Sequence, residues 1–439
     1  MIRACLFGLI GACLLSSAIA QDRETKVRND KKLLEASDFW IYNDLPKAER
    51  DAKRTKKPIL VVFRCIPCEA CHEFDEQVVE REPVIRELLD KFVCVRIPQA
   101  NGLDLSRFQF DFDMSFAIAY LHHDGTLLGR FGTRTGRENE KDDMHLLGFA
   151  DSMQRVLKLS SEIDQHRTSL AGKAAKPAAV PVPEEFPMLK GKYTDKLNYE
   201  GKVVQSCIHC HQIREAQRMV FRSENKPVPD ELLFPWPGLS ILGLKMNPET
   251  ASTITAVEPG SIAAKAKLQP GDRLASLQGQ PLVSVADAQW VLQNAGGSAA
   301  IPVEVERNGE RVKATLELPD GWRRHADISW RATTWDLRRM AFGGMVLEAM
   351  TDEERKEASL TADKMALRVK HVGQYGEHAR AKQAGLLKDD IVISYDGIDA
   401  ARTESELLSH AMQNKRRDDP VSIVALRGKE RKTFTVKLQ

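Results

Sequence analysis

The sequence predicts a multidomain chain with an α/β domain first, a small and mostly helical segment next, and two α+β modules last. Strand-like and helix-like patterns alternate over residues 36–165, and an Ala- and Pro-rich stretch without aromatic residues fills 171–183. A fixed order of turns, strands and one helix occurs twice in the C-terminal half. We therefore divide the chain into a leader (1–20), a first domain (36–165), a linker (166–183) and a small segment (184–235). Two module copies follow (238–320 and 342–439), with a connector between them (321–341).

The N-terminus has the pattern of a secretory signal peptide. Arg3 is followed by a small and apolar stretch from Ala4 to Ser17, and Ala18-Ile19-Ala20 places small residues where a signal peptidase cleaves. This stretch is too short for a membrane-spanning helix, which needs about 20 apolar residues, and no other stretch approaches that length. We expect cleavage and export to the periplasm or the medium. A loose lipobox ending at Cys13 leaves lipid anchoring as the alternative.

Composition limits the classes of partner and of chemistry. The 64 Lys and Arg residues nearly balance the 62 Asp and Glu residues, and this argues against nucleic acid as the ligand. Of the eight cysteines, Cys5 and Cys13 leave with the leader, and most of the others form two tight groups. Such grouping indicates chemistry rather than a disulfide framework. Cys94, within an apolar strand, is expected to be a buried free thiol.

Residues 36–165 alternate helical and extended patterns. The apolar run Pro58–Phe63 is typical of a strand buried on both faces. Two apolar runs separated by His122-His123-Asp124-Gly125 predict a hairpin, because Asp-Gly favours tight turns. The expected helices cover about 45–57 and 71–91, and the other strands cover 92–97, 116–121 and 126–131. This order predicts an α/β domain.

A dithiol motif follows the first buried strand directly. Cys68-Glu69-Ala70-Cys71 stands where the strand ends and a helix begins, and a helix N-terminus stabilises a thiolate. With this arrangement, and with the spacing from Phe63 to Cys68, residues 39–159 resemble the thioredoxin-like superfamily. The resemblance implies thiol–disulfide exchange in which Cys68 attacks a disulfide and Cys71 resolves the mixed intermediate.

Three features depart from the pattern of that superfamily. Pro67 stands where a Trp usually precedes the first cysteine, and no proline occurs near Met114-Ser115, where the cis-proline is expected. Cys65 adds a third thiol. The missing proline removes a substrate-binding feature and exposes the cysteines to metals. The resulting alternative is a copper or zinc site formed by Cys65, Cys68, Cys71 and His72.

The segment Cys207-Ile208-His209-Cys210-His211 has the pattern that attaches haem c covalently. Two thiols one helical turn apart meet the porphyrin vinyl groups, and the adjacent imidazole binds the iron. Residues 184–235 resemble the short c-type cytochrome segments of multidomain bacterial proteins. We therefore expect one haem c on Cys207, Cys210 and His211. A structural disulfide and half of a zinc site are alternatives, and the same string at 68–72 leaves a second haem open.

The sixth ligand of the haem iron has several candidates. Met246 and Met188 lie on flanking segments and are the best placed. Met219 follows His211 on the same expected helix, about 12 Å along it, and so does not fold back to the opposite haem face. Ordinary core methionines and an open five-coordinate iron are the alternatives.

The two module copies carry a binding motif. They resemble the PDZ domains found beside bacterial periplasmic proteases, and Ile241-Leu242-Gly243-Leu244 matches the loop whose N–H groups bind a peptide's terminal carboxylate. The resemblance implies that Leu242, Gly243 and Leu244 bind peptide, which adds as a strand to the sheet edge. The matching loop of the second copy, Phe342–Met345, is less regular. Packing or protein interaction without peptide binding is the alternative.

Protease motifs are missing from the sequence. Neither Gly-x-Ser-x-Gly nor His-Glu-x-x-His occurs, and Gly296-Gly297-Ser298 follows the helix of the first module copy. We therefore expect no serine or zinc protease. The favoured function is an exported redox protein with a dithiol and one haem c, docking a protein or peptide partner through its PDZ modules. The alternative is a non-enzymatic haem-based sensor or scaffold.

Overall fold

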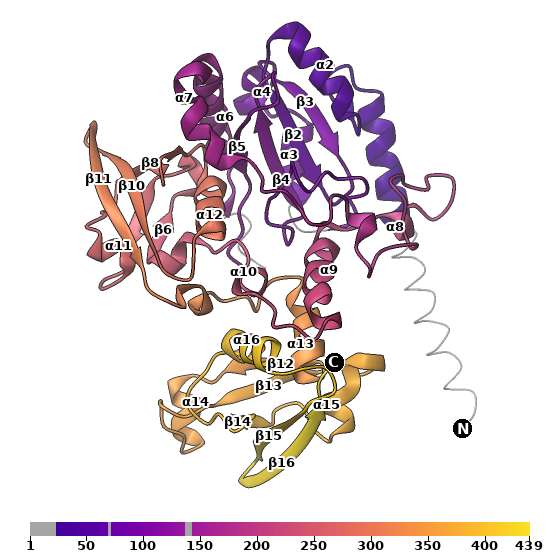
Figure 1. Cartoon of the computed structure of the whole chain (residues 1–439), viewed down its shortest axis with the longest axis vertical. Coiled ribbons are helices and arrows are strands. Elements are labelled where there is room, and N and C mark those ends of the chain that lie inside the picture. Colours follow the sequence, from indigo (N-terminus) through magenta and orange to yellow (C-terminus); the bar gives the residue numbers. More distant parts are fainter. Residues whose placement is uncertain (1–22, 69–71, 137–142) are drawn as a thin grey trace. The chain divides into compact units, whose positions relative to one another are not determined.

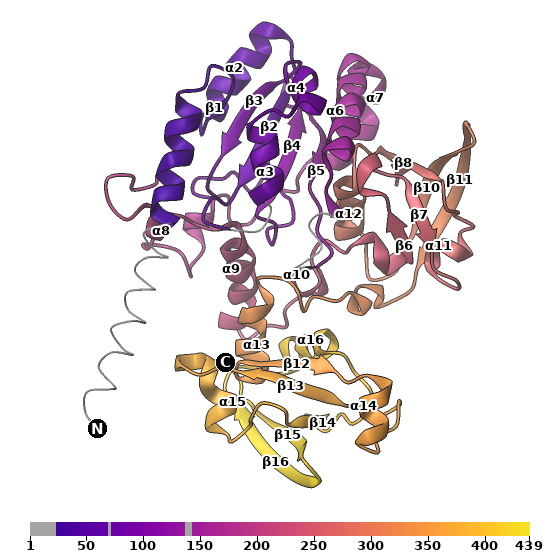
Figure 2. The same ribbon diagram turned by 180° about the vertical axis from the view of Figure 1, so that it is seen from behind.

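The computed structural model describes residues 23–68, 72–136 and 143–439. The chain forms two compact units. Unit 1 comprises the chain up to residue 213 together with 238–294 and 299–317, whereas unit 2 comprises 214–237, 295–298 and 318–439. Figures 1 and 2 show the elements of each unit from two opposite sides.

The first domain of unit 1 is built on a five-stranded mixed sheet in the order β1-β3-β2-β4-β5 (Figure 1). Its strands are β1 Ile41–Tyr42, β2 Ile59–Arg64, β3 Val93–Ile97, β4 Phe116–Leu121 and β5 Leu127–Phe131. The first three run parallel, whereas β4 and β5 pair antiparallel. Every residue of β2 is buried, as expected of a strand covered on both faces. The α/β fold predicted for this region is confirmed.

Helices pack against this sheet and define its core. They are α2 Leu45–Thr55, α3 His72–Val79, α4 Pro83–Leu89, α6 Leu146–Ser161 and α7 Ile163–Leu170. Phe74 of α3, Ile85 of α4 and Phe149 of α6 share one hydrophobic core with Leu60 and Val62 of β2. Because side chains alternate along a strand, these two β2 residues point to the same face. The turn after β2 is thereby held on a rigid strand.

The stretch predicted as a linker contains a buried charge. After α7, a short 3₁₀ turn covers Ala171–Lys173, and the Lys173 side chain is fully buried. Its ammonium lies 2.5 Å from the Asp287 carboxylate in the first module. A buried charge requires such a partner. This stretch therefore packs against the first module, although its Ala- and Pro-rich composition gave no sign of it.

The small middle segment contains three helices, α8 Val203–Ser206, α9 Cys210–Ser223 and α10 Asp230–Leu233. The C-x-x-C-H motif spans the start of α9: Cys207 has extended backbone before the helix, and Cys210 is its first residue. The apolar side chains of α10 contribute to the core of unit 2, where Leu233 is fully buried. The end of the segment therefore shares the core of unit 2.

The first module pairs two small antiparallel sheets with one longer helix. Strands β6 and β7 form one sheet, and the order β11-β10-β8-β9 forms the other. The elements are β6 Leu244–Met246, β7 Ile254–Val257, α11 Ile262–Lys265, β8 Arg273–Leu277, β9 Gln280–Pro281, α12 Val285–Asn294, β10 Ala299–Arg307 and β11 Glu310–Leu318. Strand β6 is an edge strand that follows the Leu239–Leu242 3₁₀ turn.

The second module forms one five-stranded sheet in the order β12-β13-β14-β15-β16, all antiparallel. Its elements are α13 Thr334–Phe342, β12 Met345–Ala349, α14 Asp352–Glu357, β13 Leu367–Val372, α15 Arg380–Gln383, β14 Ile391–Tyr395, α16 Glu404–Asn414, β15 Pro420–Arg427 and β16 Glu430–Lys437. Helix α16 begins at a capping box, in which the Thr403 side chain accepts from the Glu406 N–H. Strand β12 is an edge of this sheet.

The two modules contain the same ion pair between a buried Asp and a partly exposed Arg. In the first module, both carboxylate oxygens of Asp272 accept from the Arg307 guanidinium at 2.7 Å. In the second, Asp390 accepts from Arg427 at 2.8 and 2.7 Å. Two parallel hydrogen bonds between a guanidinium and a carboxylate fix their relative geometry. The repeated sequence pattern thus gives the same local structure twice.

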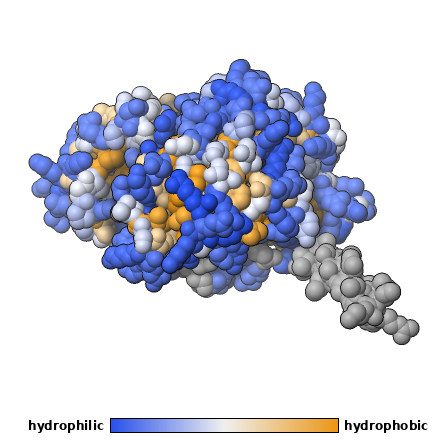
Figure 3. All heavy atoms as spheres, turned by 90° about the horizontal axis from the view of Figure 1, so that it is seen from below, coloured by the Kyte–Doolittle hydropathy of each residue, from blue (hydrophilic) through white to orange (hydrophobic). Residues whose placement is uncertain are grey.

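Across the described parts of the chain, no helix combines the length and the apolar character needed to span a bilayer. Figure 3 shows mostly hydrophilic residues on one face, with smaller apolar patches between them. This surface agrees with the 29% of charged residues in the sequence.

Candidate functional site

A disulfide closes the turn that follows β2. Cys65, directly after the strand, is bonded to Cys68. The Cys65 N–H donates to the Ser115 carbonyl at 2.9 Å, and the Cys68 N–H donates to the Cys65 carbonyl at 3.0 Å. Cys65 is buried, whereas Cys68 is half-buried. The Cys68 residue is therefore the more accessible member of the pair.

The buried guanidinium of Arg64 fixes the backbone of the same turn. It donates to the Cys65 carbonyl at 2.5 Å and to the Cys68 carbonyl at 2.9 Å. Its third contact is an ion pair of 2.9 Å with Asp75. Burial opposes ionisation of Asp75, but the adjacent Arg96 and Arg64 together hold its pKa below the usual value. A buried cluster of paired charges thus supports the disulfide turn.

The predicted exchange pair, Cys68 and Cys71, is placed only in part. Cys68 is bonded to Cys65, the third thiol noted in the sequence, and Cys71 lies outside the described residues. The exposed His72, a ligand in the alternative metal site, lies 3.2 Å from Glu76. The exchange role predicted for Cys68 and Cys71 stays a prediction.

The segment from Cys207 to His211 lies against the disulfide turn within unit 1. The Ala100 N–H donates to the Ile208 carbonyl at 3.1 Å, and the Ile208 N–H donates to the Asn101 side chain at 2.7 Å. Asn101 also donates to the Ser206 carbonyl at 2.9 Å. Cys207 and Cys210 are thiols outside the disulfide. The loop after β3 therefore holds the motif on both sides of Ile208.

His209 connects the two cysteine groups. Its Nδ1 lies 3.1 Å from the Cys65 sulfur, and its ring stacks with that of His211 at a centroid distance of 5.6 Å. Burial, with smaller contributions from His211 and Arg23, lowers the pKa of His209 to about 4, so the imidazole is neutral at neutral pH. Sequence reasoning missed this residue, because it occupies a variable position of the motif.

Three potential metal ligands meet at this point. Among the described residues, a ligand atom from each of Cys65, Cys68 and His209 lies within 4.8 Å of the other two. Burial raises the pKa of the Cys207 and Cys210 thiols to about 12, so both are protonated at neutral pH. The arrangement therefore places a disulfide, a neutral imidazole and a protonated dithiol together.

The same residues leave little space for a porphyrin. Cys207, Ile208, His209 and Cys210 border a cavity of about 10 Å³, together with Cys65 and the loop 97–100. A pocket for a cofactor-sized ligand measures several hundred Å³. A porphyrin located between the motif and loop 97–100 would thus require the two to separate. In the present arrangement the residues do not fit haem.

The methionines predicted as sixth ligands lie in different surroundings. Met246 is in β6 and lines the pocket of the first module, which shares no lining residue with the cavity beside Cys207. Met188 is half-buried in the segment before α8. Met219 packs against the core of unit 2.

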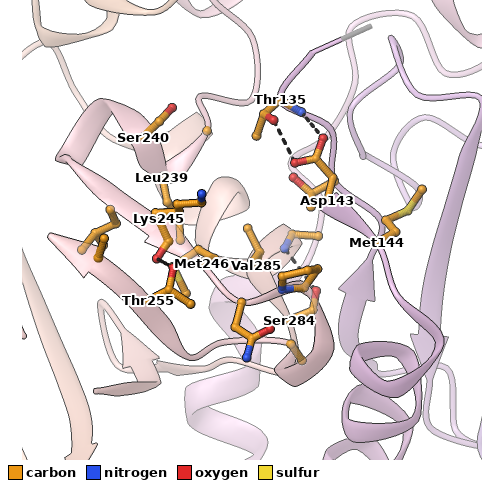
Figure 4. A pocket seen from close by; sticks show the side chains of 18 of the residues that line it. Thr135, Asp143, Met144, Leu239, Ser240, Lys245, Met246, Thr255, Ser284 and Val285 are labelled. Carbon is orange, nitrogen blue, oxygen red and sulfur yellow. Dashed lines mark hydrogen bonds between the residues drawn. The ribbon is translucent and has the colours of Figure 1, made fainter. Parts of the chain in front are cut away.

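A second candidate site is a pocket of about 1080 Å³ beside β6 and the start of α12 (Figure 4). Of the predicted peptide-binding residues, Gly243 and Leu244 line it, whereas Leu242 is buried in the module. Gly243 has φ +79°, and a Cβ there would lie 2.2 Å from the Cβ of Ser261. Glycine is therefore required at this point of the loop.

The first domain supplies another wall of this pocket. Thr135, Asp143 and Met144 line it opposite β6 (Figure 4). The Thr135 N–H and hydroxyl donate to the two Asp143 oxygens at 2.7 and 2.8 Å. This second wall was not predicted, because it joins residues that are distant in sequence.

A buried charge cluster ties the first module to the first domain. Asp287 of α12 accepts from the Lys173 ammonium at 2.5 Å and from the Arg130 N–H at 3.1 Å. The Arg130 guanidinium lies over the Trp290 ring, 4.1 Å from its centroid. Burial lowers the pKa of Lys173 although Asp287 opposes this shift. Because these groups are buried and paired, the first module is held as part of unit 1.

Family comparisons assign two parts of the chain. Residues 40–122 match a family described as thioredoxin-like, and residues 253–307 match the PDZ domain family. The Cys65–Cys68 turn lies in the first match and strands β7, β8 and β10 in the second.

Curated relatives share parts of the chain only. A probable periplasmic serine endoprotease DegP-like of Pseudomonas savastanoi pv. phaseolicola is 28% identical over 195 residues, which is 44% of this chain and 38% of that protein. The regulator of sigma-E protease RseP of Escherichia coli is 39% identical over 80 residues, 18% of this chain and 17% of that protein. The chain thus spans well under half the length of these relatives.

Among solved structures, the HtrA-type protease AlgW with decapeptide matches at 16% identity and a TM-score of 0.21, covering 32% of this chain and 48% of that one. The thioredoxin-like match covers most of the five-stranded mixed sheet, and the PDZ match covers strands β7 to β10 of the first module. The chain contains an N-terminal thioredoxin-like domain and, further along, a PDZ domain.

Proposed function

We propose that this protein is an exported thiol–disulfide exchange protein that docks its partner through the PDZ domain. The observation that carries the proposal is the Cys65–Cys68 disulfide at the end of β2, with His209 Nδ1 3.1 Å from the Cys65 sulfur. A thioredoxin-like domain supports redox chemistry, and a PDZ domain supports peptide binding.

The unequal burial of the two sulfurs favours one direction of attack. A thiolate of the partner attacks the more accessible Cys68 sulfur, the Cys65–Cys68 bond breaks, and Cys65 leaves as a thiolate. The imidazole of His209, in the tautomer with its proton on Nδ1, donates a hydrogen bond to this thiolate. Arg64 keeps the turn in place during exchange through its bonds to the Cys65 and Cys68 carbonyls.

The PDZ pocket supplies the docking step. A peptide with a free terminal carboxylate adds along the edge of β6, and the Leu242–Leu244 loop provides N–H donors for the carboxylate. Leu239, Leu244 and Val285 line the pocket and favour an apolar last residue. Because the first domain forms one wall, a docked partner contacts the domain that carries the disulfide.

Covalent haem at Cys207, Cys210 and His211 is not part of this mechanism, and it stays a prediction. A pyridine haemochrome spectrum of the exported, purified chain counts haem directly. A haem-containing chain would assign these thiols to electron transfer instead.

Reduction of insulin disulfides by the full chain, with dithiothreitol as the electron source, tests the proposal, because it is the same exchange run in the reverse direction. We expect Cys65→Ser and Cys68→Ser each to lower turnover at least tenfold, while Cys94→Ala leaves turnover unchanged. Cys94 is a suitable control because it is a buried thiol of the same domain, bonded only to the Leu89 carbonyl in the described structure. Loss of turnover in Cys71→Ser but not in Cys65→Ser would instead assign exchange to Cys68 and Cys71.

Inactivity of the wild-type chain would contradict the exchange function and leave a scaffold that binds peptides. Fluorescence anisotropy with labelled decapeptides that end in an apolar residue measures the docking step separately. The same peptides with an amidated C-terminus are the control, since they lack the carboxylate.

A further inference from the structure

The Cys207–Cys210 pair is held beside the Cys65–Cys68 disulfide by several independent contacts. Ile208, between the two cysteines, is fully buried and bonded on both its N–H and its carbonyl to residues 100 and 101. Ala100 and Asn101 follow β3, which is the neighbour of β2 in the sheet. Both cysteine pairs are thus fixed to adjacent strands of one domain.

The Cys207–Cys210 pair shares one small cavity with Cys65 of the disulfide. Cys65, Cys207 and Cys210 all border the space of about 10 Å³ described above. A void of this size holds about one water molecule, so the residues around it are near neighbours. His209, located between Cys207 and Cys210 in sequence, contacts the Cys65 sulfur directly. The exposed fraction of Cys207 is only 5%, so a large outside partner does not reach this thiol without rearrangement.

We propose that Cys207 and Cys210 are a dithiol that exchanges with the Cys65–Cys68 disulfide of the same chain, and are not haem thioethers. The inference rests on the proposed exchange function of Cys65 and Cys68. It follows from the misfit with a porphyrin: the motif is packed against the disulfide turn, and the space between them measures only about 10 Å³.

The exchange is balanced within the chain. One thiol of the Cys207–Cys210 pair loses its proton and attacks a sulfur of the disulfide, which breaks the Cys65–Cys68 bond and releases a thiolate that takes up a proton. The second thiol attacks the mixed disulfide in the same way. Cys65 and Cys68 gain two electrons and two protons, and Cys207 and Cys210 lose the same number while a bond forms between them. No outside oxidant is needed.

Trapping the mixed disulfide tests this proposal. In the full chain with Cys71→Ser, the further change Cys68→Ser leaves Cys65 without its partner. We expect mild oxidation at low protein concentration to join Cys65 to Cys207 or Cys210 in the majority of chains. Non-reducing peptide mapping by mass spectrometry identifies the joined peptides. For this experiment the chain is produced and exported in cells that attach haem to C-x-x-C-H motifs. Haem attachment to Cys207 and Cys210 can then compete with formation of the cross-link.

Matched variants separate the outcomes. Adding Cys207→Ser and Cys210→Ser abolishes the internal cross-link, whereas adding Cys94→Ala retains it. A Cys65 that stays a thiol in every variant, or haem found on the Cys207–Cys210 peptide, would overturn the proposal. If Cys207→Ser/Cys210→Ser reduces insulin at the wild-type rate and no cross-link forms, the internal exchange fails while the proposed function stands.

Discussion

The longer helix of the first module begins with Val285, whereas the longer helix of the second module begins with Glu404. Val285 lines the open pocket beside β6. Glu404 is buried, and its Oε1 accepts from the Leu347 N–H of β12 at 2.8 Å. Because β12 is an edge strand, this N–H is one that an added peptide strand would use. The first residue of this helix thus leaves the strand edge open in the first module and occupies it in the second.

Helix α13 completes the closure of the second module. Its Arg338 donates to both carboxylate oxygens of Glu404, at 2.9 and 2.5 Å, and to the Ser329 carbonyl at 2.9 Å. Leu337 and Met340 of the same helix pack in one core with Leu347. In the first module, a short 3₁₀ turn over Leu239–Leu242 stands before β6. The comparison teaches that two modules with the same ion pair differ in what precedes the edge strand, which is a helix in the second module and a short 3₁₀ turn in the first.

The largest expected effect comes from breaking the Arg338–Glu404 pair. Glu404→Ala leaves the Arg338 guanidinium buried without its partner, and we expect unit 2 to lose about 3–5 kcal/mol of unfolding free energy. Hydrogen exchange followed by mass spectrometry measures this loss for β12–β16 separately from unit 1.

Two further variants serve as controls for the stability loss in Glu404→Ala. Arg338→Leu with Glu404→Leu removes both charges, and we expect it to recover most of the lost stability because no charge is left unpaired. Val285→Ala, at the matching helix position of the first module, removes only two methyl groups from a half-buried side chain and costs about 1 kcal/mol. A Glu404→Ala cost no larger than that of Val285→Ala would show that the buried pair does not hold the second module closed.

The next effect concerns peptide binding by the first module. Val285→Glu places the acidic residue of the second module at the open pocket, where it competes for the β6 edge and repels a terminal carboxylate. We expect the dissociation constant to rise at least tenfold, equivalent to about 1.4 kcal/mol. Fluorescence anisotropy with the labelled decapeptides measures the dissociation constant, and we expect the wild-type chain to bind one peptide.

Val285→Leu is the control for that substitution, because it keeps the apolar lining and is expected to retain binding within threefold or so. Two peptides bound per wild-type chain would contradict the closure of the second module. Unchanged affinity in Val285→Glu would place the peptide elsewhere.

The sequence predicts what recurs locally. The buried strand of the first domain, the repeated turns with Gly279 and Gly397, and the buried free thiol of Cys94 follow from periodicity and composition, and the structure confirms Cys94 as buried and free. Local patterns suffice here because each element is specified by its own residues.

Contacts across long stretches of sequence could not be predicted in the same way. Glu404 lies 66 residues from Arg338, and Cys65 lies 144 residues from His209. Neither pair leaves a periodic signal, since each depends on how the chain folds back on itself. The haem prediction is limited in the same way. The five residues of the motif indicate a chemistry, but they do not indicate the distant disulfide against which the motif packs.

The smallest expected effect is a difference in acid sensitivity between the two modules. At the turn after β14, Asp396 lies 2.9 Å from His410 and 2.6 Å from Lys415, whereas the first module has Gln278 at the matching turn. Although burial opposes it, the hydrogen bonds from Lys415 and His410 lower the pKa of Asp396 below its usual value of 3.8. A carboxyl with a depressed folded-state pKa stabilises the protein above its unfolded pKa, and this contribution disappears as the pH falls below 3.8 toward the folded value.

Because the site is partly exposed, we expect unit 2 to lose less than about 1 kcal/mol through this group. Hydrogen exchange of β14–β16 at several pH values between 5 and 2 measures the loss, and Asp396→Gln, which copies the first module, should flatten it. Equal acid sensitivity in the wild type and in Asp396→Gln would assign the effect to other carboxylates.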